Sequence, residues 1–164
     1  MKITIINTGG TFNKRYNPLK GELEVPSDNI ALDEILESCF NIDFEIKNII
    51  SKDSLEIDND DRDMMIEAIN KSENEKIIIV HGTDTIDITA QYLENKDLNK
   101  QIVLTGAMVP MSIKKVEATM NFSQAIGFLN ADIKNGVYIS MHGSVVSHAN
   151  IKKDRQKGQF LINQ

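Results

Sequence analysis

The chain has 164 residues, of which 41% are hydrophobic and 26% are charged, the composition of a soluble globular protein. Its net charge of −6 argues against binding to nucleic acid, whose phosphates favour basic surfaces. The single cysteine excludes an intrachain disulfide, and no apolar run has the ~18 residues that a membrane span needs. We therefore expect one domain in the cytoplasm, with no nucleic-acid or membrane partner.

Apolar runs and helical patterns alternate from the start of the chain. The predicted strands are residues 2–7, 44–50, 76–80, 102–104 and 137–141. The predicted helices are residues 30–36, 58–69, 85–93 and 114–130. The run at 76–80 is almost wholly apolar, which is typical of a strand buried on both faces. Ser27 or Asp28 is expected to cap the first helix, and Asp58 the second.

This order of elements predicts an α/β fold. Strands that alternate with helices favour a three-layer sandwich around a mainly parallel, flavodoxin-like, doubly wound sheet with right-handed crossovers. Two segments lack a clear pattern. Residues 13–27 form a polar stretch that is long for a loop, and such loops are usually functional or disordered. Residues 144–164 are locally basic, and we expect a loop with short strands there.

Two threonine-rich motifs follow predicted strands. Thr8-Gly9-Gly10-Thr11-Phe12 comes after the first strand, and His81-Gly82-Thr83-Asp84-Thr85 comes after the third. Because parallel strands present their carboxyl ends at one edge of the sheet, where ligands usually bind, both motifs are expected to converge on one small molecule. The sequence therefore indicates an enzyme with a hydroxyl nucleophile.

A threonine hydroxyl is a weak nucleophile and needs a base or a polarising group. Thr83 and Asp84 are adjacent and cannot form a complete relay alone, so a third group must take the proton. A lysine can do this where its environment lowers its pKa. The N–H groups of Gly9 and Gly10 are expected to approach a carboxylate or an oxyanion, because glycine has no Cβ atom.

Structural alternatives exist for each motif. The first motif also fits a simple turn, and Thr83 or Asp84 also fits an N-cap of the next helix. A metal site of His81, His142 and His148 lacks a supporting carboxylate-and-histidine spacing, so we expect no metal. The glycines after the first strand do not form G-x-G-x-x-G, so we expect no dinucleotide cofactor.

Taken together, the two motifs resemble those of the bacterial asparaginase/glutaminase family. Further segments agree in order with that family: Ser51-Lys52-Asp53, Gly106-Ala107-Met108-Val109-Pro110, Asn121 and residues 136–145. An alignment without gaps from residue 136 places Lys153 on the family's catalytic lysine, with Lys152 as the neighbouring alternative. Lys52 stands where the family often has glutamine.

The resemblance implies roles for these residues. Thr11 would be the nucleophile, and Thr83 would lie across the substrate with Lys153 as base. Asp84 would bind the substrate's α-ammonium group and Ser51 its α-carboxylate, and Tyr16 would either polarise the nucleophile or pack the loop. The implied mechanism needs no metal or organic cofactor. The residues implied in substrate binding are Gly10, Ser51, Lys52, Asp53, Gly82 and Ala107.

The resemblance also implies a reaction. It is hydrolysis of the side-chain amide of L-asparagine, or of a related small amide such as glutamine, to the acid and ammonia. Residues 1–164 would be a single N-terminal-like domain, without the family's smaller C-terminal domain. Two alternatives stay open, namely an amino-acid-binding module without turnover and an asparaginase-like subunit of an amidotransferase complex. A homo-oligomer, either a dimer or a tetramer, is expected by resemblance.

Overall fold

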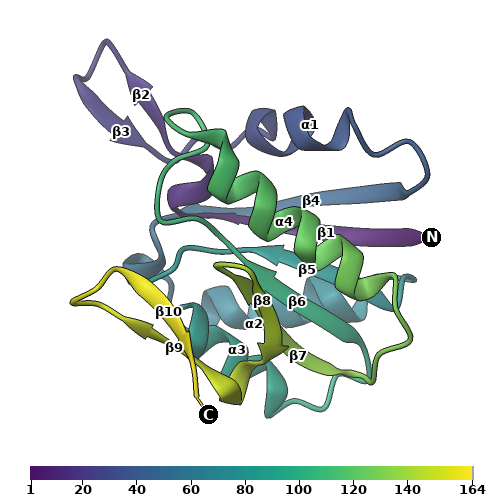
Figure 1. The fold of residues 1–164 in the computed structure, drawn as a ribbon. Helices are drawn as coiled ribbons and strands as arrows, with labels where there is room; N and C mark the ends of the chain where they lie inside the picture. Colours follow the sequence, from purple (N-terminus) through teal and green to yellow (C-terminus); the bar gives the residue numbers. More distant parts are fainter. Residues whose placement is uncertain (164) are drawn as a thin grey trace.

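The computed structural model describes residues 1–163 and shows a sheet between two layers of helices (Figure 1). The strands of the main sheet are β1 (Lys2–Gly9), β4 (Asp43–Lys52), β5 (Lys76–Val80), β6 (Gln101–Thr105), β7 (Gly136–Met141) and β8 (Ser144–Ser147). The helices are α1 (Ile30–Leu36), α2 (Asn59–Asn70), α3 (Ile86–Glu94) and α4 (Lys115–Leu129). Every strand and helix that the sequence predicts is present, with ends that differ by a few residues.

The spatial order of the sheet is β4-β1-β5-β6-β7-β8. The first five strands are parallel, and β8 runs antiparallel to β7 at the edge. Numbered along the chain, the parallel strands follow the flavodoxin order, which confirms the predicted fold class. The carboxyl ends of β1 and β5 are therefore neighbours.

Each face of the sheet has its own core. Ile77 and Ile79 of β5 pack in the core beneath α2 and α3, whereas Ile78 and Val80 pack beneath α1 and α4. All four of these side chains are fully buried. The alternation of a strand sends successive side chains to opposite faces, so a wholly apolar strand is required where both faces are covered.

The N-termini of α1 and α2 are capped in different ways. Asp58 caps α2 as predicted, because its side chain accepts from the N–H of Asp61 and that of Asp61 accepts from the N–H of Asp58. The N-cap of α1 is Asn29, not Ser27 or Asp28, and its side chain makes no capping hydrogen bond. Asp28 still accepts a hydrogen bond from the Ile30 N–H at 3.1 Å.

Short hairpins and turns complete the chain. The long polar loop contains the hairpin of β2 (Arg15–Asn17) and β3 (Glu22–Glu24), and the basic tail contains that of β9 (Ile151–Asp154) and β10 (Gln159–Ile162). Single 3-10 turns lie at η1 (Thr11–Asn13), η2 (Ser54–Glu56) and η3 (His148–Asn150). The tail thus holds the short strands that were expected, whereas the β2–β3 hairpin was not expected. Of the helices within residues 1–163, none has the length and apolarity needed to cross a membrane.

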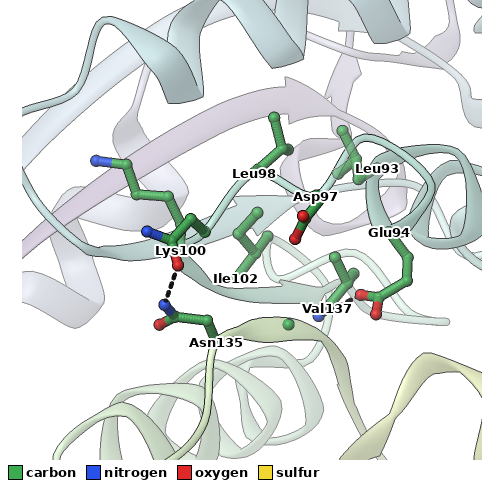
Figure 2. A pocket seen from close by; sticks show the side chains of 10 residues that line it. Leu93, Glu94, Asp97, Leu98, Lys100, Ile102, Asn135 and Val137 are labelled. Carbon is green, nitrogen blue, oxygen red and sulfur yellow. Dashed lines mark hydrogen bonds between the residues drawn. The ribbon is translucent and has the colours of Figure 1, made fainter.

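The amino-terminal edge of the sheet holds a crevice of about 70 Å³ between the end of α3 and the start of β7 (Figure 2). Polar side chains at this crevice make hydrogen bonds that fix the neighbouring turns. Glu94 Oε2 accepts from the N–H of Val137 at 2.9 Å, and Asn135 Nδ2 donates to Asn99 Oδ1 at 2.8 Å. These side chains therefore serve the fold.

Candidate active site

Glycines bring the loops after β1, β5 and β6 into close backbone contact. A Cβ atom at Gly10 would lie 2.5 Å from both the Cα and the nitrogen of Gly82. A Cβ atom at Gly106 would lie 2.3 Å from the carbonyl oxygen of His81 and 3.5 Å from Thr83 Cγ2. Real Cβ atoms do not come this close to backbone, so only glycine fits at either position. The two threonine motifs consequently lie side by side at the carboxyl edge of the sheet.

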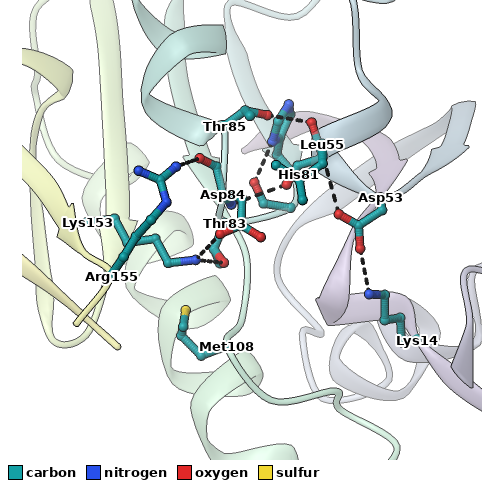
Figure 3. A network of polar contacts seen from close by, with 12 residues as sticks. Lys14, Asp53, Leu55, His81, Thr83, Asp84, Thr85, Met108, Lys153 and Arg155 are labelled. Atoms are coloured by element: carbon teal, nitrogen blue, oxygen red, sulfur yellow. Dashed lines mark hydrogen bonds and ion pairs between the residues drawn. The ribbon is translucent and has the colours of Figure 1, made fainter. Parts of the chain in front are cut away.

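Lys153 of β9 joins the second threonine motif through two hydrogen bonds (Figure 3). Its Nζ donates to Thr83 Oγ1 at 2.9 Å and to Asp84 Oδ1 at 2.7 Å. The Lys153 side chain is only 8% exposed, whereas that of Asp84 is 37% exposed. A hydroxyl within hydrogen-bond distance of an amine nitrogen has the geometry that proton transfer between them requires.

Neighbouring groups hold the Thr83–Asp84 segment in place. Ser54 Oγ accepts from the N–H of Asp84 at 3.2 Å, and the Ser54 carbonyl oxygen accepts from Thr85 Oγ1 at 2.7 Å. Arg155 Nη2 donates to the carbonyl oxygen of Asp84 at 2.7 Å (Figure 3). The N-cap of α3 is Thr85, whose side chain makes no capping hydrogen bond to the helix. The alternative that Thr83 or Asp84 caps this helix is therefore wrong.

The same motif begins with a buried histidine. His81 is fully buried, and its Nδ1 lies 2.8 Å from the carbonyl oxygen of Gly82. Because a carbonyl only accepts, Nδ1 carries the proton and Nε2 accepts from Thr89 Oγ1 at 2.9 Å. Thr89 Oγ1 in turn accepts from Arg62 Nε at 3.1 Å. Burial lowers the pKa of His81 from 6.5 to about 4, so this ring is neutral at pH 7.

This lowered pKa makes stability depend on pH. Between pH 6.5 and about 4 the unfolded chain binds a proton at His81 that the folded chain does not. The free energy of unfolding therefore falls as the pH drops through this range, by about 2 kcal/mol at about pH 5. Urea unfolding at about pH 7.5 and about pH 5 measures the difference. The His81→Gln variant should lose this share of the pH dependence; an unchanged pH dependence would argue against a neutral His81.

A second histidine holds the hairpin that carries Lys153. His142 Nδ1 accepts from the N–H of Phe160 at 3.2 Å, and Phe160 pairs with Lys153 across the hairpin. His142 Nε2 therefore carries a proton and donates to Glu117 Oε1 at 3.1 Å. Glu117 Oε1 also accepts from the N–H of Met108, in the loop after β6, at 2.8 Å. This chain of hydrogen bonds connects the β9–β10 hairpin to α4 and to the sheet edge.

A cavity of about 490 Å³ opens beside Asp84, between the β2–β3 hairpin and the sheet edge. Its polar lining is Lys14, Ser51, Asp53, Glu56 and Asp84. Lys14 Nζ contacts Asp53 Oδ2 at 2.6 Å, and this hydrogen bond holds the pKa of Asp53 below its ordinary value (Figure 3). A small ligand with charges of both signs fits this polar lining.

The sequence model of the family described as "Asparaginase, N-terminal" matches residues 2–159. The chain belongs to the asparaginase family. L-asparaginase of Thermococcus kodakarensis is 25% identical over 162 residues, which are 96% of this chain and 49% of that protein. Its solved structure has a TM-score of 0.86 and matches 99% of this chain and 51% of that one.

Two further relatives carry different names. A probable periplasmic L-asparaginase of Haemophilus influenzae is 28% identical over 166 residues, 92% of this chain and 46% of that protein. A protein of Pyrococcus horikoshii named as one subunit of a glutamyl-tRNA(Gln) amidotransferase is 30% identical over 151 residues, 86% of this chain and 33% of that protein. The chain thus spans at most about half the length of these relatives. The cytoplasmic location stays a prediction, because one relative is named as periplasmic.

The glycines of this asparaginase-family chain serve packing instead of presenting donors. The N–H of Gly9 donates to Asn7 Oδ1 at 3.3 Å, and the N–H of Gly10 donates to the Lys52 carbonyl oxygen at 2.9 Å. The expectation that these two N–H groups face a ligand is therefore wrong in this structure. Both glycines have positive φ, at 97° and 74°, so they are needed for the tight backbone path into Thr11.

Two other expected ligand contacts differ in the structure. Lys52 Nζ donates to both carboxylate oxygens of Asp61, at 2.8 and 2.7 Å, and does not line the cavity beside Asp84. The Ala107 side chain is fully buried in the core with Phe12 and so does not reach a ligand. Both side chains serve the fold in this conformation of the protein.

The expected nucleophile, Thr11, and the tyrosine expected to polarise it, Tyr16, make no hydrogen bond to Lys153 in the described part of the chain. Thr11 begins η1 and is half-buried, and within residues 1–163 its hydroxyl makes no hydrogen bond. Tyr16 lies on β2 with 63% of its side chain exposed and makes no hydrogen bond within the described part of the chain. It neither packs the loop nor polarises Thr11 in this conformation.

The three histidines do not assemble a metal site. His81 and His142 have the internal partners given above, and His148 Nε2 lies 3.3 Å from Gln91 Oε1. Among residues 1–163 no group of three or more His, Cys, Asp or Glu side chains could hold a metal ion.

Sequence reasoning missed several residues of the site. Ser54 belongs to the turn η2, which follows Asp53. Asp53 and Glu56 form a capping box around this turn, and their Asp-x-x-Glu spacing could have been recognised in the sequence. Lys14 and His142 act over long sequence distances, and no local pattern marks them.

Proposed function

We propose that the chain hydrolyses the side-chain amide of L-asparagine, or of a related small amide, to the acid and ammonia. The observation that carries this proposal is the contact of Lys153 Nζ with both Thr83 Oγ1 and Asp84 Oδ1. Membership of the asparaginase family supports the amide as the substrate class.

The proposed roles follow from position and chemistry. Thr11 Oγ1 attacks the amide carbon, and its proton passes to the leaving nitrogen by way of the Thr83–Lys153 pair. The new C–O bond forms an ester, the C–N bond breaks, and ammonia leaves. Water then cleaves the ester, with the same pair as proton acceptor, and releases the carboxylic acid and free Thr11. Burial of Thr83 and Lys153 excludes bulk water from this proton transfer.

Asp84 has two proposed tasks. In the structure its Oδ1 accepts from Lys153, while its exposed side chain borders the cavity. A substrate α-ammonium group that pairs with Asp84 competes with Lys153 for this carboxylate. Substrate binding therefore releases the Lys153 amine from Asp84 and leaves it in contact with the Thr83 hydroxyl.

Ammonia release from L-asparagine tests the proposal. We expect the wild type to release ammonia, and the Thr11→Ala and Thr83→Ala variants to lose at least about a hundredfold in rate. Thr119→Ala, the same substitution on α4 outside the site, is the control and should keep the wild-type rate. No ammonia from asparagine, glutamine or related amides would count against an amidase.

One relative favours a second candidate function, the ammonia-supplying subunit of an amidotransferase. The Pyrococcus horikoshii protein named as part of such an enzyme is 30% identical to this chain. Under this alternative, purification of the chain from its host would recover a second protein in constant proportion. If calorimetry instead shows asparagine or aspartate binding without turnover, the chain is an amino-acid-binding module.

A further inference from the structure

The cavity beside Asp84 contains one positive group among the residues that line it. Asp53, Glu56 and Asp84 supply carboxylates, Ser51 supplies a hydroxyl, and Lys14 supplies the ammonium. The family resemblance assigns the substrate's α-carboxylate to Ser51, with Lys52 as a cation beside it, but the structure directs the Lys52 side chain elsewhere.

Lys52 is occupied by a different partner. Its Nζ contacts both carboxylate oxygens of Asp61, whose side chain is only 7% exposed. Ser51 and Lys52 are consecutive residues of β4, so their side chains leave opposite faces of the strand. Ser51 lines the cavity, and Lys52 consequently does not.

Backbone hydrogen bonds fix Lys14 beside the cavity, with its ammonium group available to a ligand. It directly follows η1, which begins at Thr11, and its N–H donates to the Thr11 carbonyl oxygen at 3.2 Å. Ser112 Oγ donates to the Lys14 carbonyl oxygen at 2.7 Å, which holds the backbone from the other side. Its ammonium group makes a single contact with Asp53, at 2.6 Å, and 24% of the side chain is exposed.

We propose that Lys14 binds the α-carboxylate of the substrate and so restricts the site to amides of α-amino acids. An ammonium group has three N–H donors, and the contact with Asp53 uses one of them. The remaining donors can bind a carboxylate, while Asp84 on the same cavity accepts the α-ammonium group. Positive Lys14 and negative Asp84 together match a zwitterion. This inference rests on the proposed function and names its substrate class.

The experiment compares two substrates and the product of the proposed reaction. L-asparagine and propionamide share the reacting amide, but propionamide has no carboxylate, and L-aspartate reports binding without turnover. We expect Lys14→Met to raise the KM for L-asparagine and the Kd for L-aspartate by about tenfold to a hundredfold. The kcat for L-asparagine and the kcat/KM for propionamide should stay within about twofold of wild type. Lys14→Arg keeps the charge and should recover most of the affinity.

Other lysines provide matched controls. Lys20→Met removes the same charge from the β2–β3 hairpin, where Lys20 pairs with Glu24 outside the cavity, and it should leave both constants unchanged. Lys52→Met tests the rival assignment directly. If Lys52→Met weakens L-aspartate binding while Lys14→Met does not, the carboxylate site belongs to Lys52 and this inference is overturned.

The failures of the two proposals are distinguishable. A wild type that binds L-aspartate but responds equally to Lys14→Met and Lys20→Met overturns the role of Lys14 alone. A folded wild type that neither binds L-aspartate nor releases ammonia overturns the proposed function and the role of Lys14 with it. Equal losses of L-asparagine and propionamide turnover in Lys14→Met would show a general defect and would also contradict carboxylate recognition.

Discussion

Replacing Lys153 with methionine is expected to lower the rate of ammonia release from L-asparagine by about a thousandfold. Methionine keeps much of the length and volume of the side chain but has no amine. The hydrogen bonds to Thr83 at 2.9 Å and to Asp84 at 2.7 Å are both lost. Without the amine, no basic group contacts the Thr83 hydroxyl within residues 1–163. Steady-state rates at saturating substrate measure the effect on kcat.

The neighbouring lysine provides the control for this substitution. Lys152 is exposed and borders a different hollow, next to Asp87 and His148, because consecutive strand residues face opposite sides. Lys152→Met removes the same charge from the same hairpin and should keep near wild-type activity. Loss of activity in Lys152→Met with retention in Lys153→Met would reverse the assignment of the base.

Replacing Gly10 with alanine is expected to destabilise the fold by about 3 kcal/mol or more. The added Cβ atom would lie 2.5 Å from the Cα and nitrogen of Gly82, and backbone atoms cannot rotate away as a flexible side chain can. The backbone of Gly10, at φ 74° and ψ −176°, lies in a region that is essentially restricted to glycine, which adds about 1–3 kcal/mol for any residue with a Cβ atom. Thermal or urea unfolding followed by circular dichroism measures the loss.

Gly21 reports the cost of a Cβ atom at positive φ where nothing packs closely. Its φ of 72° is almost the same as that of Gly10, but a Cβ atom there would meet nothing within 4 Å. Gly21→Ala should therefore cost about 1 kcal/mol, the conformational share alone. Equal losses at the two positions would show that contact between the two threonine motifs does not limit stability.

The parts of the fold that sequence could predict are those dominated by burial. The run at Lys76–Val80 has apolar side chains at successive positions, and the structure buries Ile77 to Val80 in two separate cores. The β2–β3 hairpin could not be predicted in this way. Its paired residues Tyr16 and Leu23 are both largely exposed, so no alternation of apolar and polar residues marks its strands.

The residues of the site also divide into those that the sequence placed and those that it did not. Thr83, Asp84 and Lys153 were placed by motif and resemblance, and the structure brings them within hydrogen-bond distance. The assignment of Lys52 to the ligand stays a prediction that the contacts of Lys52 do not support, because a motif does not report on which face of a strand a side chain leaves. Lys52 lies one residue from Ser51, and the pleat sends it to Asp61 instead of the cavity.

Capture of the covalent intermediate tests the proposed chemistry most directly. The chain is mixed with L-asparagine, quenched with acid, digested and analysed by mass spectrometry. We expect an aspartyl group esterified to Thr11, and its absence from the Thr11→Ala variant. An aspartyl ester on Thr83 instead, or ammonia release in which Thr11→Ala matches the wild type, would contradict Thr11 as the nucleophile.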